Sequence, residues 1–546
     1  MAMDAVALGP TQSVESRSAV RRDLLAITGC FLILALAYWL GVRLVAGPVG
    51  FPLDDAYIHL QFARNLFEDG QMAFNRGVPS SGCTAPLYPV LLAGVYTLVR
   101  NWYLASAVLG GLCGLATAWV VYALLHAWTG RRDLARAGGL LAVLINPTVI
   151  SAYSGMETPL YTLLFLVGLW LYAAPGWRAL ATVALALCVW VRPEFVILLP
   201  LVALERAIAA YRAPTRRLAK FAADLWPHVC IWAAVLAAYF AYHWHQDRHL
   251  LPTTFGAKAF ALGGFSIPYL NGLPAAVARG GAILILLALT VWPLLLLLSV
   301  GIGLGVNCAQ LALGLREAAL AAWRDTSPSA AGRRLALLVF LAYPAARALV
   351  DPGTMFWYQF QRYYAHLSFL LIVLVLAAVP VTGTIVQRQF WNWTGVPLPV
   401  QLRRTLGWAC PALLGRLAFA VIAVSNINTM QVHLGAWVRE HTAPGELVAT
   451  NDIGAIGFIS RRPILDTVGL IEPQIVEHYL HGGKLLEYLK QRNPAYVIFF
   501  PNWYTDLAQR TDRLERVYSV ALKLNVICGG RELVVYRPRW YTPPEP

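Results

Sequence analysis

The sequence has 546 residues, of which 58% are apolar and 13% are charged, and its mean hydropathy is +0.58. Soluble domains carry roughly a quarter charged residues, so this composition excludes a cytosolic enzyme, a disordered chain, a coiled coil and a disulfide scaffold. It indicates a polytopic membrane protein.

The formal net charge of +15 comes from 43 Lys and Arg residues against 28 Asp and Glu residues. Cytoplasmic loops of membrane proteins collect basic residues in short clusters. The clusters in this sequence lie between apolar runs, at 21–22, 131–132, 216–220, 333–334 and 403–404. We therefore interpret the charge as a topology signal and expect no nucleic-acid partner.

In chain order, residues 1–20 are polar, and we expect a disordered cytoplasmic N-terminus. A transmembrane domain is predicted over 21–429, because runs of about 20 apolar residues can cross the hydrocarbon core. About eleven crossings are predicted: 24–45, 104–127, 137–152, 158–174, 178–192, 194–208, 225–246, 280–310, 335–350, 365–386 and 406–428. The first run lacks a convincing cleavage site and is interpreted as an uncleaved signal anchor.

One more apolar stretch, residues 84–100, could be a twelfth crossing. Counting it would place the basic residues after 130 outside and would invert every later segment, against the positive-inside rule. We therefore predict a juxtamembrane or re-entrant helix within a long first external loop, 46–103.

The same alternation places the tail, 430–546, outside the membrane. Its β-rich runs at 446–450, 463–468, 495–500 and 532–536 alternate with helical stretches at 473–492 and 503–518. This alternation predicts a small α/β extracytoplasmic domain. The predicted fold class is thus an α-helical polytopic membrane protein with a C-terminal α/β domain.

The most informative polar residues are Asp54 and Asp55, which follow the first crossing and open an amphipathic stretch with Tyr57 and His59. Two interpretations stay open. Aspartates at a helix start cap its free amide groups, whereas carboxylates beside a membrane are costly unless they are paired, metal-bound or functional.

Five further polar or aromatic residues are predicted on the same outer face. Glu157 precedes an apolar helix, where it is either a helix-start carboxylate or an acidic site residue. The others are Arg192, Lys258, Arg362 and Tyr363. Singly, each cation could be an interfacial residue, but together with the carboxylates they could hold a phosphate.

These residues resemble the bacterial GT-C superfamily of multi-spanning glycosyltransferases, which use polyprenyl-phosphate-linked sugars. Four segments of the first external loop resemble the corresponding loop of the family: Asp54-Asp55-Ala-Tyr57, Phe62-Ala-Arg64-Asn65, Phe74-Asn75-Arg76 and Ser80-Ser-Gly82. Four later segments resemble further blocks of the family: Met156-Glu157-Thr158, Arg192-Pro-Glu194, Pro252 to Lys258 and Arg362-Tyr363. Thr253 stands where Asn is expected in relatives of this type, and the acidic pair is Asp-Asp where some branches have Asp-Glu. Both departures leave a pentose or a hexose donor open.

The resemblance implies inverting transfer of a sugar from a polyprenyl phosphate to a cell-envelope glycan, lipid or protein at the outer face. It implies that Asp54 is the general base. Asp55 would either orient Asp54 or bind, together with Asp54, a divalent cation (Mg or Mn). Glu157 would be a second acidic contact to the acceptor or the metal. Tyr57, His59, Arg192, Lys258, Arg362 and Tyr363 would bind substrate.

No Walker loop or dinucleotide fingerprint occurs in the sequence, so no nucleotide cofactor is expected. Two alternatives share the hydropathy profile. A flippase or transporter of lipid-linked sugars would carry ionisable residues deep within its spans or show internal repeats. A non-catalytic scaffold would leave the acidic pair as helix caps only.

Overall fold

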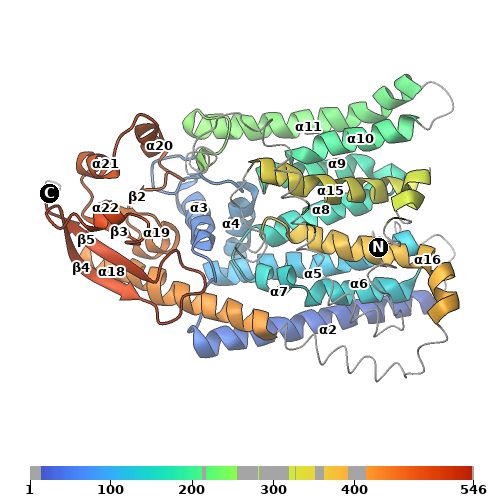
Figure 1. Cartoon of the computed structure of the whole chain (residues 1–546), viewed down its shortest axis with the longest axis horizontal. Coiled ribbons are helices and arrows are strands. Elements are labelled where there is room, and N and C mark those ends of the chain that lie inside the picture. Colours follow the sequence, from blue (N-terminus) through green and yellow to red (C-terminus); the bar gives the residue numbers. More distant parts are fainter. Residues whose placement is uncertain are drawn as a thin grey trace.

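The structure is a computed structural model, and it describes residues 14–211, 217–254, 319–325, 328–350, 362–390 and 414–543, with single positions at 281, 284, 316 and 359. Figure 1 shows a bundle of helices that lie roughly side by side, with a small domain of helices and strands at one end. The C-terminus lies in that domain. Both parts of the predicted fold class are therefore present.

The bundle is made of apolar helices, and each predicted crossing within the described residues coincides with helix. The helices are α2 (Val14–Val45), α5 (Trp102–Thr129), α6 (Arg132–Leu144), α7 (Asn146–Ala152), α8 (Thr158–Tyr172), α9 (Arg178–Leu187), α10 (Leu198–Tyr211), α11 (Arg217–Asp247), α15 (Pro328–Val350) and α16 (Ala365–Phe390). Short helices η1 (Pro175–Trp177), η2 (Cys188–Trp190) and η3 (Pro193–Ile197) connect them. Apart from positions 281 and 284, the predicted crossing at 280–310 lies outside the described residues.

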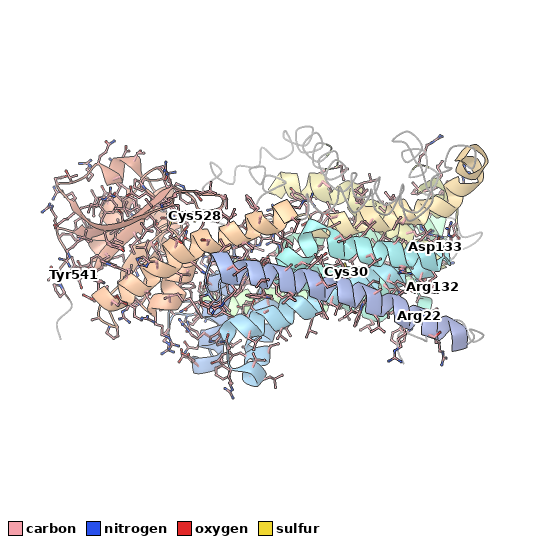
Figure 2. The ribbon with its side chains drawn as sticks, turned by 90° about the horizontal axis from the view of Figure 1, so that it is seen from below. Arg22, Cys30, Arg132, Asp133, Cys528 and Tyr541 are labelled. Carbon is pink, nitrogen blue, oxygen red and sulfur yellow. The ribbon has the colours of Figure 1, made fainter. Side chains whose placement is uncertain are left out.

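Four described helices are long and apolar enough to cross a membrane: Arg17–Val45, Trp102–Thr129, Leu218–Asp247 and Leu414–His441. Four shorter helices are also apolar. The fold is that of a multi-pass membrane protein, and the number of crossings stays a prediction. Figure 2 shows Arg22, Arg132 and Asp133 together at the end of the bundle that lies away from the small domain.

One predicted crossing, 137–152, is broken into two helices. Ile145, at the junction of α6 and α7, has extended backbone angles. Pro147 stands in the first turn of α7. Proline has no N–H and its ring clashes with the preceding turn, so it begins a new helix and cannot continue the old one.

The first external loop contains two helices, α3 (Asp55–Asp69) and α4 (Leu87–Val99). The 13 residues of α4 span about 20 Å, which is too short for a hydrocarbon core of about 30 Å. The prediction of a helix that does not cross is consistent with this length. α3 lies between α4 and the small domain (Figure 1), and it contacts both.

The small domain has a five-stranded mixed sheet in the order β2-β1-β3-β5-β4. β1 (Val448–Thr450) pairs in parallel with β2 (Ile464–Asp466) and β3 (Tyr496–Phe499), and β5 (Glu532–Pro538) pairs antiparallel with β3 and β4 (Leu514–Ala521). Its helices are α19 (Gly454–Ser460), α20 (Pro473–Leu480), α21 (Leu485–Arg492) and α22 (Thr505–Ala508). The predicted α/β composition is confirmed.

The predicted helix at 503–518 is wrong. Only α22, four residues long, is helical there, and β4 follows it. The sequence Leu-Glu-Arg-Val-Tyr-Ser-Val-Ala of β4 contains β-branched and aromatic residues that favour strands. β4 lies at the sheet edge and is exposed along much of its length, so its polar residues obscure the pattern of a buried strand.

A single helical segment, Leu414–His441, connects the bundle to the domain (Figure 1). It contains a π-helical turn, η5 (Asn428–Val432), and ends in α18 (His433–His441). The predicted domain boundary at 430 falls within η5. π-helical turns are rare and often lie at functional sites, and this one faces the junction between the two parts.

Candidate functional site

Asp54 joins the first external loop to the small domain. It stands at the start of α3, but its side chain makes no hydrogen bond to that helix. Instead its two carboxylate oxygens accept hydrogen bonds from the backbone N–H groups of Gly454 and Ala455, both at 2.8 Å. These are free amides at the start of α19, so Asp54 caps a helix 400 residues away in the chain.

Gly454 makes this close approach feasible. A Cβ at this position would lie 2.7 Å from Oδ2 of Asp54 and would overlap its main-chain oxygen. Real Cβ atoms are not found so close to backbone atoms. The glycine is therefore required for α19 to contact Asp54, and not for an unusual backbone angle.

Asp452 lies beside Asp54, in the turn that connects β1 to α19. Its Oδ2 accepts a hydrogen bond of 2.8 Å from Nε2 of Gln431 in the π-helical turn. Burial raises the pKa of Asp54 well above its usual range, and the charge of Asp452 adds to this, whereas the α19 amides act in the opposite direction. Burial also raises the pKa of Asp452, to about 6, although the Gln431 hydrogen bond lowers it.

This raised pKa predicts a pH-dependent stability. Protonated Asp452 favours the folded state fully below about pH 4, the pKa of an unfolded aspartate, and this contribution is lost as the pH rises through about 6. We expect Asp452→Asn to be stabilised relative to the unsubstituted protein by on the order of 1 kcal/mol at pH 7.5 and by less at pH 4.5. Melting temperatures in detergent at both pH values measure this difference.

The matched control is Asp512→Asn, because Asp512 is an exposed carboxylate paired with Arg513. It should show the same difference from the unsubstituted protein at both pH values. A difference for Asp452→Asn that does not grow between pH 4.5 and 7.5 would contradict the assigned pKa.

Glu157 is the centre of a buried ionic cluster. Its side chain is fully buried, and it does not cap α8. Its oxygens accept hydrogen bonds from Nη1 of Arg192 at 2.8 Å and from Nε and Nη2 of Arg362 at 2.9 and 3.1 Å. A further hydrogen bond of 3.0 Å joins Oε2 to Nε2 of His59. Burial opposes ionisation, but Arg362, His59 and Arg192 together hold the pKa of Glu157 well below its usual range.

Arg362 connects Glu157 to Asp55. Its Nη1 donates to Oδ2 of Asp55 at 2.7 Å and to Oε1 of Gln359 at 2.7 Å. The Asp55 side chain is 38% exposed, whereas that of Arg362 is 7% exposed. Asp55 is therefore the solvent-facing end of a chain of charges that runs through Arg362 to buried Glu157.

Tyr363 lies between two guanidinium groups. The Cζ atoms of Arg192 and Arg347 lie 4.2 and 4.3 Å from its ring centroid, and that of Arg362 lies 5.8 Å away. Guanidinium groups stack favourably on aromatic faces. Three buried cations thus converge on this ring. Arg192 pairs with Glu157 and Glu194, and Arg362 pairs with Asp55.

The structure therefore brings together seven of the predicted residues: Asp54, Asp55, His59, Glu157, Arg192, Arg362 and Tyr363. Tyr57 is near in sequence but packs in the core among Phe51, Tyr103 and Phe458. Lys258 lies outside the described residues. The substrate contacts of all these residues stay predictions.

Other residues of the first loop fasten it to the domain. Asn75 exchanges two hydrogen bonds of 2.8 Å with the backbone of Ile464, as a neighbouring strand would. Buried Arg64 donates to the carbonyl of Phe458 at 2.8 Å and lies over its ring. Outside the first loop, Thr253, which follows α11, also donates to the domain, at the carbonyl of Leu470, at 2.8 Å. These contacts hold Asp54 and Asp55 at the junction.

Two residues of the cluster were not found from the sequence. Arg347 is the single charged residue of the apolar run 335–350, and an ionisable residue within such a run is a signal for a functional site. Asp452 directly follows a buried parallel strand, and ligands of α/β sheets bind at the carboxyl ends of such strands. Both signals were present in the sequence.

The predicted divalent-cation site fits these positions poorly. Both oxygens of Asp54 accept α19 amides, and Oδ2 of Asp55 faces a guanidinium group. Among the described residues, no group of three or more His, Cys, Asp or Glu side chains is arranged to hold a metal ion. The cation stays an untested prediction, and no chemical step below uses it.

Comparison with known proteins places this arrangement in a wider context. Residues 425–541 match a family model described as a domain of unknown function (DUF8728). No curated protein matches the chain. The crystal structure of ArnT from Cupriavidus metallidurans bound to undecaprenyl phosphate is similar to this chain, with a TM-score of 0.54 and 14% sequence identity. The alignment covers 94% of this chain and 98% of the ArnT chain. ArnT in the apo state gives 14% identity, the same coverage and a TM-score of 0.53.

An oligosaccharyltransferase from Archaeoglobus fulgidus, tethered with an acceptor peptide, is 12% identical over 86% of this chain and 68% of its own, with a TM-score of 0.48. At 14% identity, the likeness to ArnT establishes the fold and nothing finer. The chain thus shares the fold of ArnT over nearly its whole length, and this fold agrees with the helical bundle and C-terminal α/β domain expected from the sequence.

Proposed function

We propose that this protein is an integral-membrane glycosyltransferase that moves a sugar from a polyprenyl-phosphate donor to a cell-envelope glycan, lipid or protein. The observation that carries the proposal is the junction itself. An aspartate pair from the first loop adjoins a cluster of three buried arginines where the bundle contacts the domain. The fold it shares with ArnT, a protein crystallised with undecaprenyl phosphate, supports a polyprenyl-phosphate donor.

In the proposed reaction, the acceptor hydroxyl attacks the anomeric carbon while the bond from that carbon to the phosphate oxygen breaks. The configuration at the anomeric carbon inverts. The hydroxyl proton passes to a carboxylate base, for which we propose Asp54, because its raised pKa makes it a better proton acceptor than an ordinary aspartate. The polyprenyl phosphate leaves with one additional negative charge.

That additional charge requires a positive partner. We propose Arg362, with Arg192 and Arg347 behind it, because Arg362 has one exposed carboxylate partner, Asp55, and one buried partner, Glu157. A phosphate arriving from the exposed side would displace Asp55 and leave Glu157 in place. Asp55 therefore competes with the donor for Arg362 and becomes free to orient the acceptor when the donor is bound.

This competition predicts opposite effects on binding and turnover. We expect Asp55→Asn to lower the KM for the donor lipid several-fold, because Arg362 loses a competing anion, and to lower kcat by about tenfold to a hundredfold. Steady-state kinetics at varied donor concentration measure both values. The control is Asp512→Asn, which alters an exposed ion pair of the domain. A raised KM for Asp55→Asn would contradict the competition.

The direct test is to incubate the purified protein in detergent with a panel of polyprenyl-phosphate pentoses and hexoses and an envelope acceptor. Release of polyprenyl phosphate with at least one donor supports the proposal. Movement of the donor lipid across a vesicle membrane without cleavage would instead identify the flippase or transporter alternative. Activity at the outer face of a bacterial plasma membrane, with the N-terminus in the cytoplasm, is part of the proposal.

A further inference from the structure

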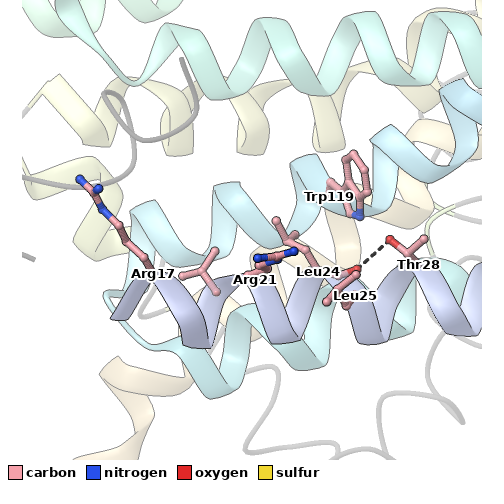
Figure 3. A pocket seen from close by; sticks show the side chains of 7 residues that line it. Arg17, Arg21, Leu24, Leu25, Thr28 and Trp119 are labelled. Carbon is pink, nitrogen blue, oxygen red and sulfur yellow. Dashed lines mark hydrogen bonds between the residues drawn. The ribbon is translucent and has the colours of Figure 1, made fainter. Parts of the chain in front are cut away.

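A cavity of about 330 Å³ lies between α2 and α5, in a part of the bundle that the proposed reaction does not use. Figure 3 shows Arg17, Arg21, Leu24, Leu25 and Thr28 of α2 around it, with Trp119 of α5 opposite. The cations lie toward the N-terminal end of α2, and the apolar side chains follow them. The cavity is thus polar at one end and apolar at the other.

The two arginines are available to an anion. Arg17 and Arg21 are one helical turn apart and therefore lie on the same face of α2. Both are exposed, and no described carboxylate forms an ion pair with either. Nearby Arg132 and Arg136 differ, because both pair with buried Asp23.

An apolar track continues from the cavity along the same face of α2. Leu25, Leu32 and Leu36 follow Arg21 at steps of four or seven residues, and their side chains are 60%, 57% and 69% exposed. From Leu25 to Leu36 the helix rises about 16 Å, which is close to half of a hydrocarbon core of about 30 Å. The track therefore matches the length of one lipid leaflet.

Trp119 adds an unused hydrogen-bond donor. Its indole Nε1 is buried and has no partner in the described structure, and Figure 3 shows that nitrogen turned toward α2. A buried N–H without an acceptor is unfavourable, so an oxygen from a ligand in the cavity would stabilise it. A phospholipid has such oxygens directly below its phosphate.

We propose that this cavity binds one anionic phospholipid, with its phosphate on Arg17 and Arg21, an ester oxygen near Trp119 and an acyl chain along Leu25, Leu32 and Leu36. The apolar track selects a lipid over a free phosphate, and the paired cations select an anionic headgroup over a zwitterionic one. The site is independent of the proposed transfer reaction, because it lies at the N-terminal end of α2, whereas Asp54 follows the C-terminal end of this helix.

The test is native mass spectrometry of the delipidated protein in detergent, titrated separately with dioleoyl-phosphatidylglycerol, dioleoyl-phosphatidylcholine and inorganic phosphate. We expect one tightly held phosphatidylglycerol, and at least tenfold weaker binding of the other two ligands. Arg21→Gln should weaken phosphatidylglycerol binding about tenfold. Arg22→Gln is the matched control, because Arg22 carries the same charge one residue further on and does not line the cavity.

A second variant, Leu24→Trp, fills the cavity and leaves the charge unchanged, and it should also remove the tight binding. Equal weakening by Arg21→Gln and Arg22→Gln would mean that only diffuse charge attracts the lipid, and would overturn the proposal. Equal binding of phosphatidylcholine, displacement by inorganic phosphate, or unchanged binding in Leu24→Trp would overturn it as well.

Discussion

We expect Glu157→Gln to lower the free energy of unfolding by about 3–5 kcal/mol. Glu157 is fully buried and accepts hydrogen bonds from Arg192 and Arg362. Glutamine keeps the shape of the side chain but removes its charge, so two buried guanidinium groups lose their shared anion. Breaking a buried ion pair by removing one partner leaves an uncompensated charge in a medium of low dielectric constant.

The measurement is the melting temperature of the purified variant in detergent. The control is Glu68→Gln, because Glu68 also pairs with two arginines, Arg76 and Arg461, but both of these are more than half exposed. Such surface pairs contribute less than about 1 kcal/mol. Equal melting temperatures for the two variants would contradict the buried ionic cluster.

We expect Gly454→Val to lower the rate of sugar transfer at least about a hundredfold, because displacement of a catalytic group by about 1 Å has this effect. The side chain of valine would occupy the space of Asp54, whose Oδ2 lies 2.7 Å from the position of the new Cβ. α19 would have to move away, and Asp54 would lose both of its amide donors.

Gly445→Val is the control, since a Cβ at Gly445 in the same domain meets no atom within 4 Å. Its transfer rate should equal that of the unsubstituted protein. Gly454→Ala adds the same Cβ without branching, and it keeps the test informative if the valine variant does not fold. A normal transfer rate in both Gly454 variants would exclude a catalytic role for the contact between Asp54 and α19.

The sequence was sufficient to predict the architecture. Apolar runs and basic clusters predicted the helical bundle, and the separation of α4 from the crossing helices stays a prediction. The tail was predicted as α/β from its alternating runs, but β4 was missed because an exposed edge strand lacks the pattern of buried residues. Its pairing with β5 is a tertiary contact that local patterns do not contain.

The candidate site was predicted by residue type, and its connections were not. The carboxylate of Asp54 binds backbone N–H groups of α19. Every residue except proline has such a group, so residue types do not identify these partners. Glu157 was expected as an acidic contact to substrate or metal, and this contact stays a prediction. The structure shows that His59, Arg192 and Arg362 are its side-chain partners, which the sequence did not indicate. An order of residues along a chain does not specify which cations converge on which carboxylate.

The central claim is that the aspartate pair at the junction transfers a sugar from a polyprenyl phosphate. The most direct measurement is the release of polyprenyl phosphate from a sugar-loaded donor in proteoliposomes, compared between the unsubstituted protein and Asp54→Asn at equal melting temperature. We expect release by the unsubstituted protein and a rate about a hundredfold to ten-thousandfold lower for Asp54→Asn. Equal rates of release for the two proteins would contradict this claim.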